Sequence, residues 1–364
     1  MRICLLSMEI FAWGKHGGYG RATRVIGREL ARRGVPVTAV VPRRGSQGPV
    51  ERLDGIEVLS FEPGMPWRAA RLLRECNADV YHSQEPSFTT YLAQKIMPSR
   101  AHLVTLRDTH DLSDWIAELR FPSLNRLQVL SNKLYEDNLL VQRAVRRASR
   151  VCAAAEFLRA KGARKYRLAS LPELLPTPVA VPHVVEKAAT PTVCYLARWD
   201  RRKRPEIFLD LAGKFPRVRF VAFGTSRDRA YERQLRSRYA SVPNLELAGY
   251  VDQFGSGLVA ETLSASWILV NTSVREGLPN AFLEAAAHGC AILSSADPDG
   301  FASRFGARVV GDDFAAGLSQ LLANNRWREC GALGREYVRT TYELELAMDR
   351  HLRHYRELTG AQPV

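Results

Sequence analysis

The sequence predicts an α/β protein built from two doubly wound domains, each with its own mostly parallel sheet. Short apolar runs alternate with helical patterns along most of the chain, which is typical of a βαβ series. Residues 170–191 interrupt this alternation with five prolines and no amphipathic period, as expected of a linker. The 364 residues also exceed the size at which one hydrophobic core stops growing. We therefore assign residues 1–175 to a first domain, 176–189 to a linker and 190–341 to a second domain.

The first half contains six predicted strands, at residues 2–7, 35–42, 56–61, 78–83, 102–108 and 150–155. Each is a short apolar run of strand length. The helix expected between the first two strands, about residues 20–33, carries its apolar residues on one face and ends at Gly34. A longer, basic helical stretch is predicted over residues 122–148.

The second half repeats the pattern. Its predicted strands lie at residues 192–198, 218–224, 245–251, 267–273 and 291–296. Its predicted helices lie near residues 204–214, 228–240, 254–264, 280–288 and 313–323. In open parallel sheets, ligands bind beyond the carboxyl ends of the strands. Two such sheets facing each other form a cleft, and we expect the chemistry there.

The net charge of +14 is concentrated in the first half of the chain. Residues 1–185 carry 28 basic against 17 acidic side chains, and the remainder carries 24 against 21. Three anionic partners fit this excess: nucleic acid, an anionic membrane surface, or a phosphorylated acceptor such as a polyprenyl-diphosphate-linked sugar. An arginine-rich solvated surface explains it equally well. Because basic residues recur at helical spacing without interleaved aromatics, we expect no nucleic acid partner.

Other sequence features narrow the class of protein. No run approaches the ~20 apolar residues that span a membrane, and no secretory leader precedes the first strand, so we expect a soluble, cytoplasmic protein. The six cysteines are scattered without metal-ligand spacing, which favours buried structural thiols. No catalytic triad, zinc motif or phosphate-binding Walker loop is present. We expect neither a metal nor a cofactor.

The segment EGLPNAFLEAAAHGC, residues 276–290, carries the strongest functional signal. Pro279 suits the first turn of a helix, so Glu276 lies in the preceding loop and Glu284 on the helix. The free N–H groups at the helix start suit a diphosphate, which makes Gly277, Leu278 and Asn280 candidate binding residues. Carboxylates accept hydrogen bonds from hydroxyl groups, so Glu276 would hold a sugar and Glu284 a ribose. This pattern predicts a nucleotide-sugar site.

The segment resembles the E-x7-E motif of retaining glycosyltransferases of family 4, which have the GT-B fold of two Rossmann-like domains. Arg198 and Lys203, in ARWDRRKRP, are similar to the family's G-R-x-x-x-x-K pattern, with Ala197 in place of the glycine. The resemblance implies that both cations stabilise the leaving diphosphate. It also implies that the last helical stretch, residues 342–364, packs back on the first domain.

The resemblance extends to other positions. In the loop after the first strand, Gly17 and Gly18 correspond to a glycine loop beside the donor diphosphate; a simple tight turn is the alternative. Strand ends at Gly224 and at Tyr250 and Val251 match those that border the nucleoside, although both side chains also suit a core. In TLRDTHD, where the family has a histidine that contacts the donor sugar, Arg107 and Asp108 align with it and His110 lies one turn away. Arg107 or His110 would take that role.

These features together predict a metal-independent hexosyltransferase that moves a sugar, with retention, from a UDP- or GDP-sugar to a hydroxyl of a glycan, lipid-linked or small-molecule acceptor. Arg198, Lys203 and Glu276 are the predicted catalytic residues. The basic stretch at 122–148 suggests a peripheral contact with an anionic membrane at its inner face. Two alternatives are a non-catalytic nucleotide-sugar-binding scaffold of a glycan-assembly complex and a GT-B nucleotide-sugar epimerase.

Overall fold

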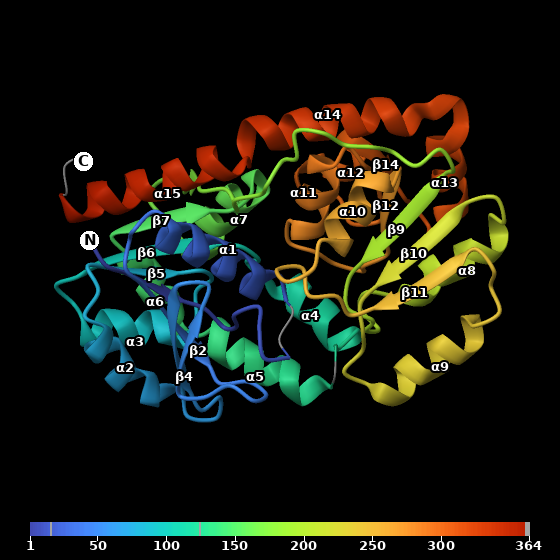
Figure 1. Cartoon of the computed structure of the whole chain (residues 1–364). Helices are drawn as coiled ribbons and strands as arrows, with labels where there is room; N and C mark the ends of the chain where they lie inside the picture. The colour runs from blue at the N-terminus through green and yellow to red at the C-terminus, as the bar shows by residue number, and fades with distance from the viewer. Residues whose placement is uncertain (15–16, 124, 361–364) are drawn as a thin grey trace. The chain divides into compact units, whose positions relative to one another are not determined.

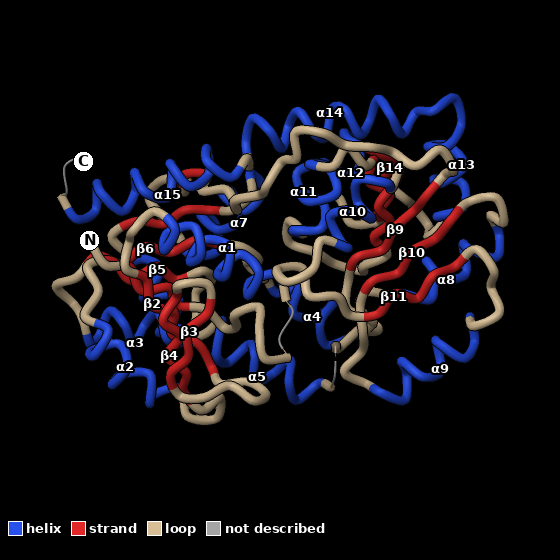
Figure 2. The backbone as a smooth tube through the Cα atoms, in the orientation of Figure 1, coloured by secondary structure: helices blue, strands red, loops and turns tan. Residues whose placement is uncertain are grey.

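A computed structural model describes residues 1–14, 17–123 and 125–360 (Figure 1). The chain divides into two compact units. Unit 1 contains Met1–Asp111, Leu130–Pro178 and the chain from Leu344 onward, and unit 2 contains Leu112–Val129 and Val179–Glu343. Each unit has a central sheet, drawn in red in Figure 2, with helices packed around it. Both units are Rossmann-like α/β domains, as the sequence predicts.

Unit 1 has an eight-stranded sheet in the order β3-β4-β2-β1-β5-β6-β7-β8. Its strands are β1 (Ile3–Leu6), β2 (Val37–Pro42), β3 (Val50–Leu53), β4 (Ile56–Phe61), β5 (Val80–Ser83), β6 (Ala101–Leu106), β7 (Arg150–Ala153) and β8 (Glu173–Leu174). All neighbouring pairs are parallel except β3 with β4. Three of the six central strands, β1, β2 and β5, are fully buried along their length, and β4 and β6 are buried at all but one residue, which explains their continuous apolar runs.

The helices of unit 1 are α1 (Gly18–Arg32), α2 (Ala69–Cys76), α3 (Phe88–Ile96), α6 (Leu139–Arg147), α7 (Glu156–Tyr166) and α15 (Leu344–Thr359). The last of these belongs to the core: Met348 and Tyr355 of α15 pack in one cluster with Ile3 and Leu5 of β1. The structure thus places the end of the chain in the same unit as its beginning.

Unit 2 has a six-stranded, all-parallel sheet in the order β11-β10-β9-β12-β13-β14. Its strands are β9 (Thr192–Leu196), β10 (Arg219–Phe223), β11 (Leu245–Gly249), β12 (Ile268–Asn271), β13 (Ala291–Ser294) and β14 (Gly306–Arg308). Its helices are α4 (Leu112–Arg120), α8 (Pro205–Lys214), α9 (Arg229–Tyr239), α10 (Leu258–Ala265), α11 (Asn280–Ala287), α12 (Phe301–Phe305), α13 (Phe314–Leu322) and α14 (Arg326–Thr341).

Three features differ from the sequence-based expectation. The prediction of a single helix over 122–148 is wrong, because two helices occupy this stretch. Helix α5 (Arg126–Glu136) ends at Glu136, and Asn138 caps the start of α6 by accepting hydrogen bonds from the N–H groups of Leu140 and Val141. Residues 112–129, placed by sequence within the first domain, are grouped with unit 2. Helix α14 and the short strands β3, β8 and β14 had no prediction.

Both sheets contain a point at which the strand order reverses. In unit 1 it lies between β1 and β5, and in unit 2 between β9 and β12. At such a point the two connecting loops diverge to opposite sides and leave a crevice at the carboxyl ends of the strands. The segments after β1, β5, β9 and β12 therefore occupy the places where this fold class binds ligands.

Two further observations concern the whole described chain. No helix among the described residues is long and apolar enough to cross a membrane. All six cysteines are buried and carry free thiols.

Candidate functional site

The order reversal in unit 2 brings two predicted residues into direct contact. Lys203 lies in the loop after β9 and Glu276 in the loop after β12, and the Lys203 ammonium forms an ion pair with Glu276 Oε1. Asn271, the last residue of β12, donates from Nδ2 to the same oxygen over 3.1 Å. Only 13% of the Lys203 side chain and 11% of the Glu276 side chain are exposed. The pair is therefore shielded from bulk water.

The charge state of Glu276 follows from these contacts. Burial alone would raise the pKa of its carboxyl group. The charge and hydrogen bond of Lys203, with smaller contributions from Ser273 and Arg202, more than offset burial and lower this pKa below its usual value. Glu276 is accordingly a carboxylate at neutral pH, able to accept hydrogen bonds from hydroxyl groups.

Arg198 stands two residues beyond β9 and does not join this pair. Its Nη2 lies 3.7 Å from Asp200 Oδ2, and about a third of its side chain is exposed. Trp199, between the two, is fully buried and anchors the loop by donating from Nε1 to the carbonyl of Phe223 over 3.3 Å. Arg198 is thus a fixed cation at the end of the strand, with part of its surface open to solvent.

Helix α11 begins where the sequence predicts. Pro279 is the residue that precedes its first turn, with extended backbone, and the Phe282 N–H donates to the Pro279 carbonyl over 3.0 Å. Glu284 lies in the second turn and is buried at 6% exposure, not on a solvated face. Gly277 and Leu278 precede the helix, and Leu278 packs against the core that α11 covers.

Position 224 requires glycine, because the backbone of a neighbouring segment lies too close for any side chain. Its φ is +126°, and a Cβ atom there would lie 1.9 Å from the Ala197 carbonyl oxygen. Its N–H donates to the Gly249 carbonyl over 2.7 Å, so the ends of β9, β10 and β11 are drawn together. Tyr250, which follows, has 43% of its side chain exposed, whereas Val251 packs partly against the core. Of the two, Tyr250 has the surface available to a ligand.

The glycine loop of unit 1 has a role that its sequence did not reveal. Glu9, which is buried, places its carboxylate against the start of α1, and the Gly20 N–H points to Glu9 Oε1 at 3.4 Å. A Cβ at Gly17 would lie 1.8 Å from that oxygen, and one at Gly20 would lie 2.8 Å from the Phe11 backbone nitrogen. These glycines therefore admit the chain's own carboxylate to the helix N-terminus, where we predicted an external anion.

Arg107, at the end of β6, is buried and turned into unit 1. Its guanidinium donates to Gln84 Oε1 over 2.6 Å and 3.2 Å and to Thr177 Oγ1 over 2.6 Å. Burial lowers its pKa to about 10. The N–H groups of Arg107 and Asp108 donate to Glu85 Oε2 over 2.5 Å and 2.9 Å. Burial raises the pKa of Glu85 to about 7 in spite of these bonds.

His110 is also buried, and Lys165 Nζ donates to its carbonyl oxygen over 2.6 Å. The predicted residues of unit 1 are thus Gly17, Gly18, Arg107 and His110, and the other candidates belong to unit 2. Sequence reasoning missed Glu9, Gln84, Glu85 and Asn271. A polar residue at the end of a buried strand, or within two residues after it, was the available signal for Gln84, Glu85 and Asn271.

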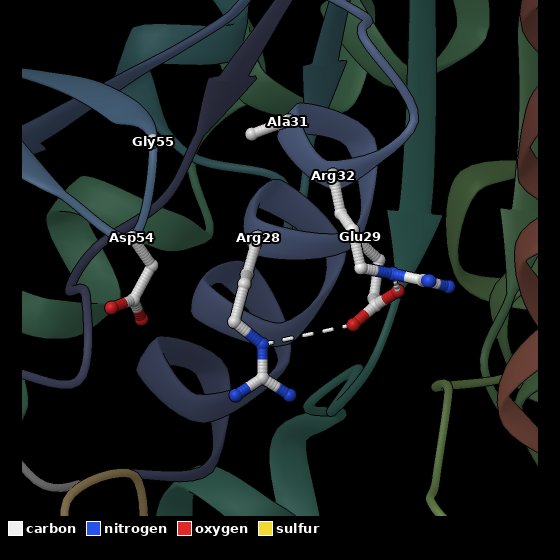
Figure 3. Close-up of a pocket in the computed structure, with 6 residues that line it drawn as sticks. All are labelled: Arg28, Glu29, Ala31, Arg32, Asp54 and Gly55. Atoms are coloured by element: carbon white, nitrogen blue, oxygen red, sulfur yellow. Dashed lines mark hydrogen bonds and ion pairs between the residues drawn. The ribbon is translucent and has the colours of Figure 1, made fainter.

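An open pocket on unit 1 lies apart from all of these residues. It is lined by Arg28, Glu29, Ala31 and Arg32 of α1 and by Asp54 and Gly55 of the β3–β4 turn (Figure 3). Arg28 Nε lies 3.7 Å from Glu29 Oε1, and the Glu29 carboxylate also binds Arg32. Asp54, the other acidic residue of the lining, binds Arg24 outside the pocket over 2.7 Å. The charges of this pocket thus already have protein partners, and we assign it no function. Among the described residues, no group of histidine, cysteine or acidic side chains has the arrangement of a metal site.

Two family models match the chain. Residues 16–181 match the model described as Glycosyltransferase Family 4, and residues 190–324 match the model described as Glycosyl transferases group 1. The second match contains every candidate residue of unit 2, and the first contains those of unit 1. No curated protein sequence matches the chain significantly.

Several solved structures have the same fold. Sucrose-phosphate synthase from Thermosynechococcus elongatus superimposes with a TM-score of 0.73 at 17% identity, covering 100% of both chains. HepE from Anabaena, in complex with UDP, gives 0.70 at 12% identity and covers 98% of this chain and 100% of its own. The catalytic domain of starch synthase IV from Arabidopsis thaliana, bound to ADP and acarbose, gives 0.64 at 13% identity and 99% of each chain. The similarity establishes the GT-B fold.

Proposed function

Because the chain belongs to the family 4, group 1 glycosyltransferases, we propose that it transfers a sugar from a nucleotide-sugar donor to a hydroxyl group, with retention of anomeric configuration and without a metal ion. One observation carries this proposal. Lys203 and Glu276 come from different strand ends and meet at the order reversal of unit 2. A cation and an acceptor for hydroxyl groups thus stand side by side where this fold binds ligands.

The geometry suggests a role for each residue. The diphosphate would lie against the N-terminus of α11, whose first N–H groups favour negative charge. Lys203 and Arg198 would stabilise the charge that develops on the leaving phosphate as its bond to the sugar breaks. Glu276 would orient the sugar hydroxyls and Glu284 the ribose. The acceptor hydroxyl would give its proton to the leaving phosphate, which explains why no second catalytic carboxylate is needed.

The donor is proposed to be a UDP- or GDP-sugar. HepE was solved with UDP and with UDP-glucose, which shows that this fold accommodates such a ligand at low sequence identity. In this chain, Tyr250 offers an exposed ring beside the strand ends at Gly224 and Gly249. A ring at this place can pack against the flat face of a base.

The acceptor is proposed to be a glycan or a lipid-linked sugar at an anionic membrane. At the junction of α5 and α6, Leu134 and Leu139 are 73% and 80% exposed, and Leu140 is 42% exposed. Exposed Arg143 and Arg147 continue the same helix, α6. Leucines followed by arginines suit the boundary between acyl chains and anionic headgroups.

Vesicle binding tests this membrane contact. The protein should sediment with vesicles that contain phosphatidylglycerol and stay in solution with phosphatidylcholine alone. Leu139→Ser should weaken sedimentation, whereas Leu333→Ser, which alters an exposed leucine of α14 (60% exposure) outside this surface, should not. Equal binding of wild type and Leu139→Ser would remove this surface from consideration.

Transfer itself is tested by incubating the protein with UDP-, GDP- and ADP-sugars and measuring nucleoside diphosphate release, with and without candidate acceptors. Glu276→Gln and Lys203→Met should each lower release from the preferred donor by at least about 100-fold, the usual effect of one charge-stabilising group. Gly64→Ala, on an open turn of unit 1, is the control. Tight nucleotide binding without release under any condition would favour a non-catalytic scaffold.

A further inference from the structure

Helix α4 carries two carboxylates on one face, and both bind arginines of unit 2. Asp114 and Glu118 are four residues apart, so their side chains are neighbours on the helix. Arg275 Nε lies 2.6 Å from Asp114 Oδ1, and its Nη1 lies 3.8 Å from Glu118 Oε1. Arg202 Nη1 donates to the same Glu118 oxygen. The four side chains are between 10% and 17% exposed, so these are shielded ion pairs.

The two arginines occupy particular places in the chain. Arg202 immediately precedes Lys203, and Arg275 immediately precedes Glu276. Their loops are joined through the backbone, because the Val274 N–H donates to the Arg202 carbonyl over 3.0 Å. Thus α4 holds the residue next to each member of the Lys203–Glu276 pair.

Both Arg202 and Lys203 act on the Glu276 carboxylate. Arg202 is close enough to contribute to the lowered pKa of Glu276, although Lys203 contributes more. A guanidinium forms stronger and more directional bonds to a carboxylate than an ammonium does. With Glu118 neutral, Arg202 would lose its own carboxylate and would compete with Lys203 for Glu276. Arg275 would likewise lose one of its two carboxylate partners on α4 and keep Asp114.

We propose that Asp114 and Glu118 are positioning residues of the donor site: by binding Arg275 and Arg202, they keep these guanidinium groups from replacing Lys203 as the cation paired with Glu276. This role rests on the proposed function, because it presumes that Lys203 and Glu276 act on the donor. Helix α4 also follows directly on the segment 107–111 in the chain, so a helix from the first half of the sequence organises residues of the second.

The experiment uses Glu118→Gln, which keeps the shape and removes the charge, and the double variant Glu118→Gln/Arg202→Met. Donor turnover is measured as kcat and KM. In parallel, the amine of Lys203 is acetylated under limiting reagent and quantified by mass spectrometry against Lys214, an exposed lysine of the same unit. The control is Glu29→Gln, which neutralises a buried carboxylate of unit 1 that binds Arg32 and Arg33 over 2.8 Å and 2.6 Å.

Glu118→Gln should lower kcat at least 10-fold with less than a threefold change in donor KM, and should raise Lys203 acetylation at least threefold. Adding Arg202→Met should return both values to within about threefold of wild type. Glu29→Gln should change neither. A merely structural ion pair would lower the melting temperature and leave kcat of the folded protein unaltered.

Three results would overturn the proposal: unchanged Lys203 acetylation in Glu118→Gln, no rescue by Arg202→Met, or a rise in kcat, which would mark α4 as inhibitory. The acetylation readout does not depend on turnover. If wild type releases no nucleotide from any donor, the proposed function fails while acetylation still decides whether α4 controls the Lys203–Glu276 pair.

Discussion

The Lys203–Glu276 ion pair should contribute to the stability of unit 2 as well as to activity. At a separation of about 3 Å and an effective dielectric constant of 20, two unit charges attract by about 5 to 6 kcal/mol. Desolvation of both groups offsets much of this, because each side chain is nearly buried. Removing one partner leaves the other charge uncompensated. We expect Lys203→Met to cost about 3 kcal/mol, and Glu276→Gln somewhat less because glutamine still accepts from Asn271.

The double variant separates stability from activity. Lys203→Met/Glu276→Gln should cost less than about 2 kcal/mol, which implies a coupling energy of about 3 kcal/mol. Stability should therefore recover while donor turnover stays lost, because both donor contacts are absent. The matched control is Arg219–Glu246, a 2.7 Å pair of the same unit with 58% and 50% exposed side chains. Its coupling should be below about 1 kcal/mol, as for surface pairs.

Urea unfolding at pH 7, followed by tryptophan fluorescence, measures these energies. Four of the six tryptophans belong to unit 2, so the signal reports mainly on that unit. The two units have separate cores, and the unit 2 transition is the one to fit. If the single variants cost less than 1 kcal/mol each and their effects simply add, the charges are not coupled and the assignment of a shielded pair is refuted.

The remaining predictions concern unit 1, and each is checked by urea unfolding followed by circular dichroism. Gly20→Ala should destabilise unit 1 by about 2 to 4 kcal/mol, because the new Cβ lies 2.8 Å from the Phe11 nitrogen and must displace backbone. Gly64→Ala, with open space around it, should be neutral. Equal effects of the two substitutions would refute the close approach at Gly20. Burial, with the charge of a nearby arginine, lowers the pKa of His351 to about 3. The stability that neutral His351 contributes above pH 6.5 is therefore lost as pH falls, by about 1.4 kcal/mol per pH unit. Between pH 6.5 and 5, His351→Gln should thus lose about 2 kcal/mol less stability than wild type. The raised pKa of Glu85, about 7, acts in the opposite sense: its contribution to stability is complete below the unfolded pKa near 4.5 and is lost as pH rises through 7. Glu85→Gln should therefore gain stability relative to wild type between pH 5 and 8. Parallel stability profiles of the two proteins would contradict the assignment.

Much of the fold was readable from local patterns. All eleven strands predicted by sequence are present, because a strand buried on both faces needs an uninterrupted apolar run and such runs are local. Helix α11 begins at Asn280 as the proline and the periodicity indicated. The break in the 122–148 stretch escaped prediction because both sides of Asn138 have helical periodicity, and only the side-chain cap separates α5 from α6.

The candidate site divides in the same way. Glu276 was predicted from its place in the loop before a helix, and Lys203 from the resemblance of its segment to a family motif. Their contact depends on β9 and β12 being neighbours in the sheet. This pairing joins segments about 70 residues apart, and no local pattern of the sequence encodes it. The same is true of Glu9, which occupies the start of α1, and of Glu118, which binds Arg202 from 84 positions away.

The sequence by itself therefore determined the class of fold, most of its elements and the chemical types at the site, since these depend on periodicity and on residues close together in the chain. Only the tertiary structure decided which charges are shielded and paired. The burial of a charge and its partner are set by how distant segments pack. The carboxylates of α4, for example, are paired only because the fold brings Arg202 and Arg275 to them.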